Sequence, residues 1–165
     1  MSLKFYIIEC AALCAAFGAL VIAMLFINPL SFISDYPPEI QERYYSSQRK
    51  AAAKGRLTKM MIAKKAFFII LGLFLFALMA HITGAVSYVQ SLIAVCGYIA
   101  VLAVFDIVVL DWLIFPNVKR IRLPGTEDMN AEYRQMWFHV RSTLVMLPIL
   151  ILGAPISAGI MVWIW

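Results

Sequence analysis

Two carboxylates interrupt a long apolar stretch in the second half of the chain. Residues 92–115 are almost entirely apolar, but they include Asp106 and Asp111. The stretch is long enough to cross a bilayer. Holding an ionised carboxylate in a membrane costs about 3 kcal/mol even on the milder insertion scales. These two aspartates are therefore candidates for function, and each needs a partner if its role is structural.

The depths of the two aspartates suggest different roles. At a rise of about 1.5 Å per residue, Asp106 lies roughly 5 Å from the bilayer midplane and Asp111 roughly 12 Å from it. We expect Asp111 to pair with Lys64, Lys65 or Arg141 near the interface. Asp106 has no basic residue at its depth in a neighbouring span. It is therefore a candidate for proton or cation movement, or for a hydrogen bond to another helix. Five residues apart on a straight α-helix, the two carboxylates would point roughly 140° apart.

Two further polar residues lie in apolar spans, at similar depths in the opposite half of the membrane. They are Glu9 in the first span and His81 in the second. We expect them to form a polar contact if the two spans pack together. Because histidine titrates near neutral pH, a proton-handling pair is the alternative.

A third group of polar residues is expected at the interface near Asp111. His139 and Arg141 begin the last span at about the depth of Asp111, and Glu127 and Asp128 precede them. These five residues could form one cluster. Asp111, His139 and Arg141 are then weak catalytic candidates, because aspartate and histidine can act as general acid or base. No nucleophile–base motif accompanies them.

Composition assigns the chain to the all-α membrane class. Hydrophobic residues make up 64% of the 165 residues and charged residues 14%, whereas a soluble domain is about half apolar and a quarter charged. We predict a single domain of four transmembrane helices, residues 1–165. The predicted spans are residues 5–27, 66–86, 92–115 and 142–165. The polar segments 28–65 and 116–141 connect them.

Each polar segment carries signals for a short amphipathic helix at the membrane surface. In the first, Ser34 or Asp35 can cap a helix whose first turn holds the prolines and Glu39. In the second, Pro124-Gly125 suits the central positions of a type II turn. We expect Thr126 to cap a following helix that leads into the last span.

Basic residues concentrate in these two segments. The net charge is +5, and of the 14 Lys and Arg only Lys4 lies outside residues 28–65 and 116–141. The positive-inside rule then predicts that both polar segments are cytoplasmic and both termini outside, in a cell membrane. No nucleic-acid-binding module is present. We expect one run of basic residues to bind anionic lipid head groups. The alternative is that this run binds a phosphate-bearing substrate. The run comprises Arg49, Lys50, Lys54, Arg56, Lys59, Lys64 and Lys65.

Small residues recur at a spacing of four in the first and last spans. Pairs such as Ala11 with Ala15 and Gly153 with Ser157 allow close helix approach in lipid. They predict contact between these spans, or with a second copy or another membrane protein. The three cysteines form no Cys-x-x-Cys motif, so neither a metal site nor a cofactor is predicted.

Three stretches of the second half together resemble a group of small bacterial four-span membrane proteins. They are Phe105-Asp106-Ile107-Val108-Val109-Leu110-Asp111-Trp112, the Pro-Gly-Thr-Glu turn at 124–127, and Phe138-His139-Val140-Arg141. The likeness covers about a quarter of the chain. It implies that Asp106, Asp111, the turn and His139 belong to one unit, in a bacterial inner membrane. It implies no activity.

The sequence therefore leaves three functions open. The first is a non-enzymatic accessory, scaffold or small transport-related subunit. The second is a membrane enzyme acting on a lipid or another amphiphile at the cytoplasmic interface. The third is proton or cation translocation through Asp106. The sequence specifies neither substrate nor partner nor oligomeric state.

Overall fold

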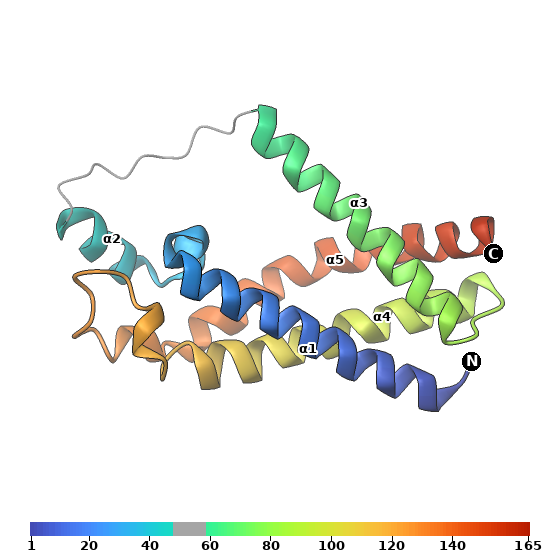
Figure 1. Cartoon of the computed structure of the whole chain (residues 1–165), viewed down its shortest axis with the longest axis horizontal. Coiled ribbons are helices and arrows are strands. Elements are labelled where there is room, and N and C mark those ends of the chain that lie inside the picture. Colours follow the sequence, from blue (N-terminus) through green and yellow to red (C-terminus); the bar gives the residue numbers. More distant parts are fainter. Residues whose placement is uncertain (48–58) are drawn as a thin grey trace. The chain divides into compact units, whose positions relative to one another are not determined.

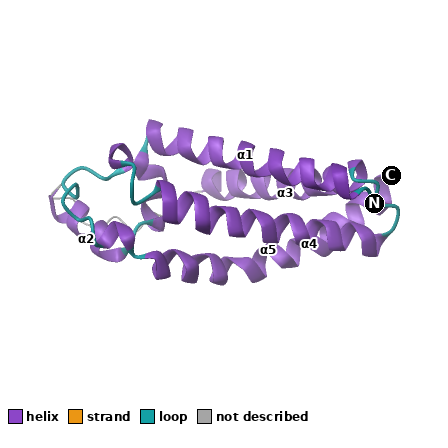
Figure 2. Ribbon diagram, turned by 90° about the horizontal axis from the view of Figure 1, so that it is seen from below, coloured by secondary structure: helices purple, strands orange, loops and turns teal. Residues whose placement is uncertain are grey.

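The structure, a computed structural model, describes residues 1–47 and 59–165 (Figure 1). All regular structure in this part of the chain is helical (Figure 2), so the predicted all-helical class is confirmed there. The longer helices are α1 (Leu3–Ile27), α3 (Lys59–Ile82), α4 (Tyr88–Phe105) and α5 (Met136–Ile164). A π-helix, η2 (Asp106–Ile114), follows α4 directly.

Two helical segments in the described residues are long and apolar enough to cross a membrane. They are Leu3–Ile27 and the continuous Tyr88–Ile114. Helix α5 has two parts that lie at an angle to each other, Met136–Val145 and Leu150–Ile164, and together they could form a third span. It contains Pro148 and Pro155. The apolar part of α3, Ala66–Ile82, is shorter. The chain is thus compatible with a membrane protein of at least two spans.

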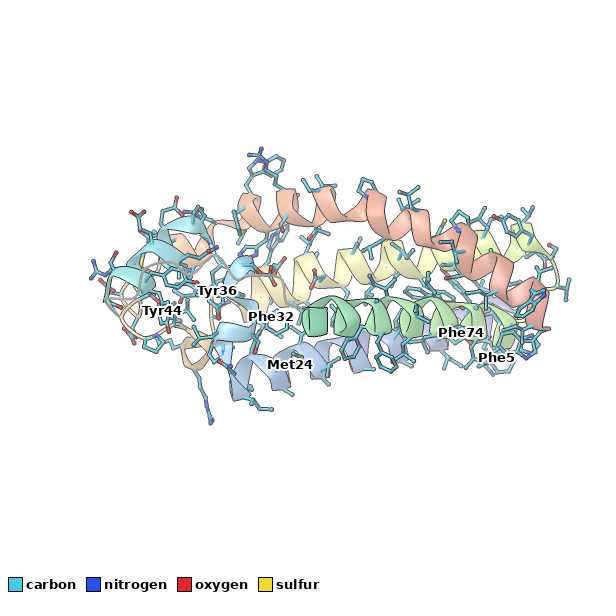
Figure 3. All side chains as sticks on the ribbon, turned by 90° about the horizontal axis from the view of Figure 1, so that it is seen from above. Phe5, Met24, Phe32, Tyr36, Tyr44 and Phe74 are labelled. Carbon is cyan, nitrogen blue, oxygen red and sulfur yellow. The ribbon has the colours of Figure 1, made fainter. Side chains whose placement is uncertain are left out.

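Apolar side chains on these helices are widely exposed. Phe5 on α1 and Phe74 on α3, both labelled in Figure 3, are 54% and 45% exposed. Long runs of exposed Leu, Ile and Phe would be unfavourable in water, but they match a lipid surrounding.

Contacts divide the chain into two compact units. The first unit comprises Met1–Cys14, helix α3, α4 up to residue 103 and Met146–Trp165. Its core includes Ala77 and Ala80 of α3, Val95 and Tyr98 of α4, and Ala154 of α5. Small residues allow the backbones of these helices to come close.

The chain ends meet the turn between α3 and α4 within the first unit. The backbone N–H of Ser2 donates to the Thr83 carbonyl at 2.8 Å. The ring of Trp165 stacks on His81 with 4.8 Å between the ring centroids. Gly84 has φ +85°, a conformation that favours glycine in this turn.

The second unit brings the two polar segments together. It comprises α1 from residue 15, η1 (Pro29–Asp35), α2 (Pro38–Ser47), and the chain from residue 104 to 145. Tyr36 lies at its centre and is fully buried, and its hydroxyl donates to the Ile121 carbonyl at 2.8 Å. Figure 3 shows Tyr36 and Tyr44 in the crowded region around α2. Helix α2 begins at Pro38 with Glu39 in its first turn, as predicted. Ser34 and Asp35 do not cap it, because both belong to the preceding 3-10 helix η1.

The second polar segment folds differently from the prediction. Gly125 has φ +83°, and the Thr126 N–H donates to the Leu123 carbonyl, so the Pro-Gly turn forms. The expected helix from Thr126 does not follow, because the Thr126 hydroxyl instead bonds the Leu123 carbonyl and the Tyr133 hydroxyl. Only short 3-10 helices, η3 (Lys119–Ile121) and η4 (Glu132–Arg134), occur before α5.

Candidate functional site

A cavity of about 220 Å³ lies within the second unit. Three segments that are distant in sequence provide its polar side chains: η1 provides Asp35, η2 provides Asp106 and Asp111, and α5 provides His139. The remaining lining residues are mostly apolar or bear hydroxyls; they are Phe17, Val21, Leu25, Phe32, Leu110, Ile114, Phe115, Ser142 and Thr143.

The π-helix explains why both aspartates of one helix reach the same cavity. In η2 each backbone N–H bonds the carbonyl five residues earlier, as the Phe115 N–H does to Leu110 at 2.8 Å. Residues five apart, such as Asp106 and Asp111, then lie on the same side of the helix. The predicted separation of their directions is therefore wrong, because it assumed a straight α-helix.

Asp111 contacts a histidine in the described part of the chain. Its Oδ1 lies 3.4 Å from Nδ1 of His139, which is 5% exposed. Arg141, two residues further on, is exposed. Lys64 and Lys65 belong to α3, but their side chains lie outside the described residues. A carboxylate facing Nδ1 favours the proton on that nitrogen and orients the imidazole ring.

The second ring nitrogen of His139 has no hydrogen-bond partner among the described residues. The ring is held edge-on against Phe115, with 5.0 Å between centroids. A buried polar atom without a partner is uncommon and calls for an explanation. His139 lines the cavity, but this nitrogen atom is itself buried.

Asp35 adds a carboxyl from outside the apolar helices. It keeps exposed surface, but the protein surrounding it in the cavity wall raises the pKa of its carboxyl above 3.8. A hydrogen bond from the Ser34 hydroxyl, at 3.2 Å, lowers the pKa and offsets part of that effect. Asp35 is thus more easily protonated than a free aspartate.

The described lining of this cavity holds no strongly basic side chain. None of its described lining residues is Lys or Arg. The nearby buried Arg122 bonds the Glu127 and Pro116 carbonyls and the Asn130 side chain, and it stacks on the Tyr133 ring. Its hydrogen bonds therefore hold the second polar segment together and are not directed to the carboxylates.

The expected five-residue cluster forms only in part. Asp111 and His139 come together, whereas the Glu127 carboxylate accepts the Gly125 N–H at 3.0 Å. Backbone N–H groups, first that of Glu127 itself, lower the pKa of that exposed carboxyl. Asp128 lies 4.0 Å from Arg43 of α2 at the surface. Loop geometry separates these acids from the cavity.

The expected pairing of Glu9 with His81 is wrong. Within the first unit, Oε2 of Glu9 accepts hydrogen bonds from the hydroxyls of Thr83 and Tyr98. His81 is exposed and stacks on Trp165. Glu9 thus finds neutral donors on α4 and in the turn after α3, two residues beyond His81.

The basic residues proposed to bind lipid head groups fall mostly outside the described part of the chain. Arg49, Lys50, Lys54 and Arg56 lie outside the described residues. Lys59 begins α3, and Lys64 and Lys65 follow on it, but their side chains are not described either. The structure therefore adds nothing to this prediction.

Asp35 is the cavity residue that sequence reasoning assigned differently. It was expected only as a helix cap, because its neighbours Pro37 and Pro38 carry a helix-start pattern. Asp35 lines the cavity because η1 folds back toward η2, and no local sequence pattern indicates this return. Among the described residues, no group of three or more His, Cys, Asp or Glu is arranged to hold a metal ion.

Comparisons with models of protein families, with curated proteins and with solved structures found no match.

Proposed function

We propose that this chain is an integral membrane protein with a small, non-enzymatic, transport-related role centred on the acidic cavity. The observation that carries the proposal is that three carboxyls, Asp35, Asp106 and Asp111, share one cavity. Among the described lining residues, the only basic group there is His139. Carboxylates held away from water are costly unless they bind a proton or a cation. The site is therefore suited to take up and release one of these.

The proposed membrane arrangement has four spans, with α3 and α5 joining the two segments that qualify by length. Contacts between the polar segments, such as Tyr36 with Ile121, support their placement on one side of the membrane. Their basic residues favour the cytoplasmic side. Contacts of Ser2 with Thr83 and of Trp165 with His81 support a common, outer side for both termini.

Reconstitution tests this function. Purified protein in sealed vesicles, under an inside-negative potential, is expected to carry protons or small cations, followed by an internal pH dye and by ion uptake. Asp106→Asn keeps the side-chain shape but removes the titratable charge, and it should abolish the flux. Glu42→Gln removes an exposed carboxylate of α2 outside the cavity and should leave the flux unchanged. A flux that survives Asp106→Asn would rule the role out.

A second candidate, a membrane enzyme for a lipid or another amphiphile, is favoured by the contact between Asp111 and His139. A carboxylate that orients a histidine is a recurring general-base arrangement. Ser142 also lines this cavity, one helical turn after His139 on α5. If His139→Ala and Asp111→Ala left the lipid composition of producing cells unchanged, this function would lose its support.

The scaffold role depends on exposed small residues. Ala154, Ser157 and Ala158 of α5 are fully buried within the chain, whereas Ala11 and Ala15 of α1 are exposed. A contact with a second copy or another membrane protein is therefore proposed through α1. Disulfide cross-linking of an Ala11→Cys variant, in a background with the native cysteines replaced, should trap such a dimer. Absence of any cross-link would count against it.

A further inference from the structure

The lining of the acidic cavity has the composition of an organic-cation site. An apolar cavity of about 150 Å³ can hold benzene. At about 220 Å³, this one has room for a ring-sized apolar group and one small polar group. Phe17, Phe32 and Phe115 provide aromatic walls beside the carboxyls. Aromatic faces attract cations as well as apolar groups.

The strongest polar groups of the cavity wall are hydrogen-bond acceptors. Ionised Asp35, Asp106 and Asp111 can only accept hydrogen bonds. Nδ1 of His139 faces Asp111, and its Nε2 points away from that carboxylate. His139 is 5% exposed, and this nitrogen has no partner among the described residues. A fitting ligand must therefore bring N–H or O–H donors as well as positive charge.

A bare metal ion fits the wall less well than an organic cation does. Divalent metals need several oxygen or nitrogen ligands converging on one point. Among the described residues no three acidic, histidine or cysteine side chains converge in this way. Carboxyls distributed along an otherwise apolar wall suit a cation that carries its own apolar surface.

We propose that the cavity binds a primary or secondary organic ammonium group, whose N–H donors are shared between the carboxylates of Asp111 and Asp106. The apolar part of the ligand lies against the three phenylalanines. This assignment rests on the proposed function, since it names the class of cation that the cavity takes. A free amine and the amine head group of a lipid offer the same chemistry.

Calorimetric titration of the full chain, in nanodiscs of phosphatidylcholine, tests the assignment with three probes of similar shape. Benzylammonium has charge and N–H donors, benzyltrimethylammonium has charge only, and benzyl alcohol has no charge. Benzylammonium is expected to bind saturably, and each of the others on the order of 10-fold or more weaker. Equal affinity for benzylammonium and either of the other two probes would overturn the proposal.

Variants locate the binding in the cavity. Asp111→Asn should weaken benzylammonium binding on the order of 10- to 100-fold, since it removes a charged acceptor. Asp35→Asn removes another negative charge from the cavity wall, at a position outside the apolar helices with less risk to folding, and should weaken binding less than Asp111→Asn does. Glu42→Gln removes an equal charge from the same unit, outside the cavity, and should not change the affinity. Unchanged affinity in both aspartate variants would overturn the proposal.

Lipid composition distinguishes the two sources of the amine. Phosphatidylethanolamine has a primary ammonium head group, whereas phosphatidylcholine has a quaternary one. If phosphatidylethanolamine in the nanodisc competes with benzylammonium, the natural ligand is a lipid head group. If it does not compete, the ligand is a soluble amine, and either result upholds the assignment.

Failure of this assignment is distinct from failure of the proposed function. Flux that depends on Asp106, without benzylammonium binding, would leave a proton or inorganic-cation role and reject the organic ligand. Saturable benzylammonium binding without any flux would uphold the ligand class and reject transport. Absence of both would reject both.

Discussion

At the scale of single residues, acidic side chains of this chain are stabilised in two different ways. Glu9 is held by hydroxyl groups of Thr83 and Tyr98, which are neutral donors. Among the described residues, Asp111 contacts His139, and Asp35 accepts a hydrogen bond from its neighbour Ser34. Both hydroxyls donate to Oε2 of Glu9, and Oε1 is buried without a partner among the described residues. Acids that share a cavity, in contrast, remain available to a proton or ligand.

The pH dependence of stability should show the contribution of the Asp35 carboxyl. Because burial raises the pKa of Asp35, the folded state binds a proton more tightly than the unfolded state does. This contribution is fully present below pH 3.8 and is lost as pH rises through the higher pKa of the folded protein. Asp35→Asn should therefore stabilise the protein relative to wild type at neutral pH but not at pH below 3.8.

Thermal unfolding in detergent between about pH 3.5 and 7 measures this difference. Glu127→Gln is the matched control with the opposite sign, because the pKa of Glu127 is lowered from 4.5 by backbone N–H groups. The ionised carboxylate of Glu127 stabilises the folded protein above pH 4.5, and this stabilisation is lost as the pH falls through the lowered pKa. A constant difference between Asp35→Asn and wild type across this range would contradict the expectation.

The hydrogen bonds of Glu9 predict unequal effects of two substitutions. Glu9→Gln retains a carbonyl oxygen that accepts from Thr83 and Tyr98, and should be close to wild type in stability. Glu9→Leu removes the acceptor and leaves buried hydroxyls poorly paired, at a cost of about 1–3 kcal/mol. Chemical unfolding in detergent compares them, and equal stabilities of the two variants would argue that these bonds contribute nothing.

At the scale of elements, helix type and helix approach position the functional side chains. The π-helix η2 brings Asp106 and Asp111 to one cavity, although both belong to the apolar segment Tyr88–Ile114. Such π segments are rare and often occur at functional sites. In the first unit, the close approach of α1 and α4 is possible because position 97 is a glycine.

Gly97 offers a test of that approach. A Cβ at this position would overlap the Tyr6 hydroxyl oxygen and lie 3.2 Å from its Cζ. Gly97→Ala should therefore destabilise the protein by about 1–3 kcal/mol through overpacking. Tyr6→Phe removes the clashing oxygen together with its long hydrogen bond, of 3.4 Å, to the Ala94 carbonyl.

The double variant Gly97→Ala with Tyr6→Phe should recover most of the lost stability. Unfolding of the four proteins in detergent forms a double-mutant cycle that isolates the interaction between the two positions. Additive effects, with no recovery in the double variant, would show that helix approach at Gly97 does not depend on Tyr6.

At the scale of the whole molecule, the polar segments connecting the apolar helices fold onto each other. The first contributes Tyr36 and α2, and the second contributes Ile121, Leu123 and Tyr133. These residues form a buried cluster in the second unit, which also contains the acidic cavity. Residues 28–47 and 116–135 therefore act together as a structural support, in addition to connecting helices.

Tyr36 is the residue whose removal should weaken this support most selectively. Tyr36→Phe keeps the ring against Phe115 but removes the hydrogen bond to Ile121, at about 1 kcal/mol. Asp128→Asn, which disrupts only the exposed contact with Arg43, should cost well under about 1 kcal/mol. Thermal unfolding in detergent measures both, and a larger loss in Asp128→Asn would contradict this ranking.

Part of the candidate site could be predicted from sequence. Asp106, Asp111 and His139 are conspicuous because polar groups in or beside apolar spans need partners. Their mutual arrangement could not be predicted, because an α-helix and a π-helix turn the same side chains to different faces. Asp35 and Phe32 lie in a polar segment whose return toward η2 depends on long-range packing of Tyr36. Thr83 and Tyr98, as partners of Glu9, likewise come from separate parts of the chain.

The amino-acid sequence by itself determined that the chain is helical and apolar enough for a membrane, because hydrophobic run length and composition reflect the surrounding solvent directly. It also located the helix boundaries around Asn28-Pro29 and the Pro124-Gly125 turn, where local backbone preferences dominate. Only the tertiary structure decided which polar groups meet. That outcome depends on the wide turn of η2 and on contacts between distant segments, such as Tyr36 with Ile121, and local sequence encodes neither.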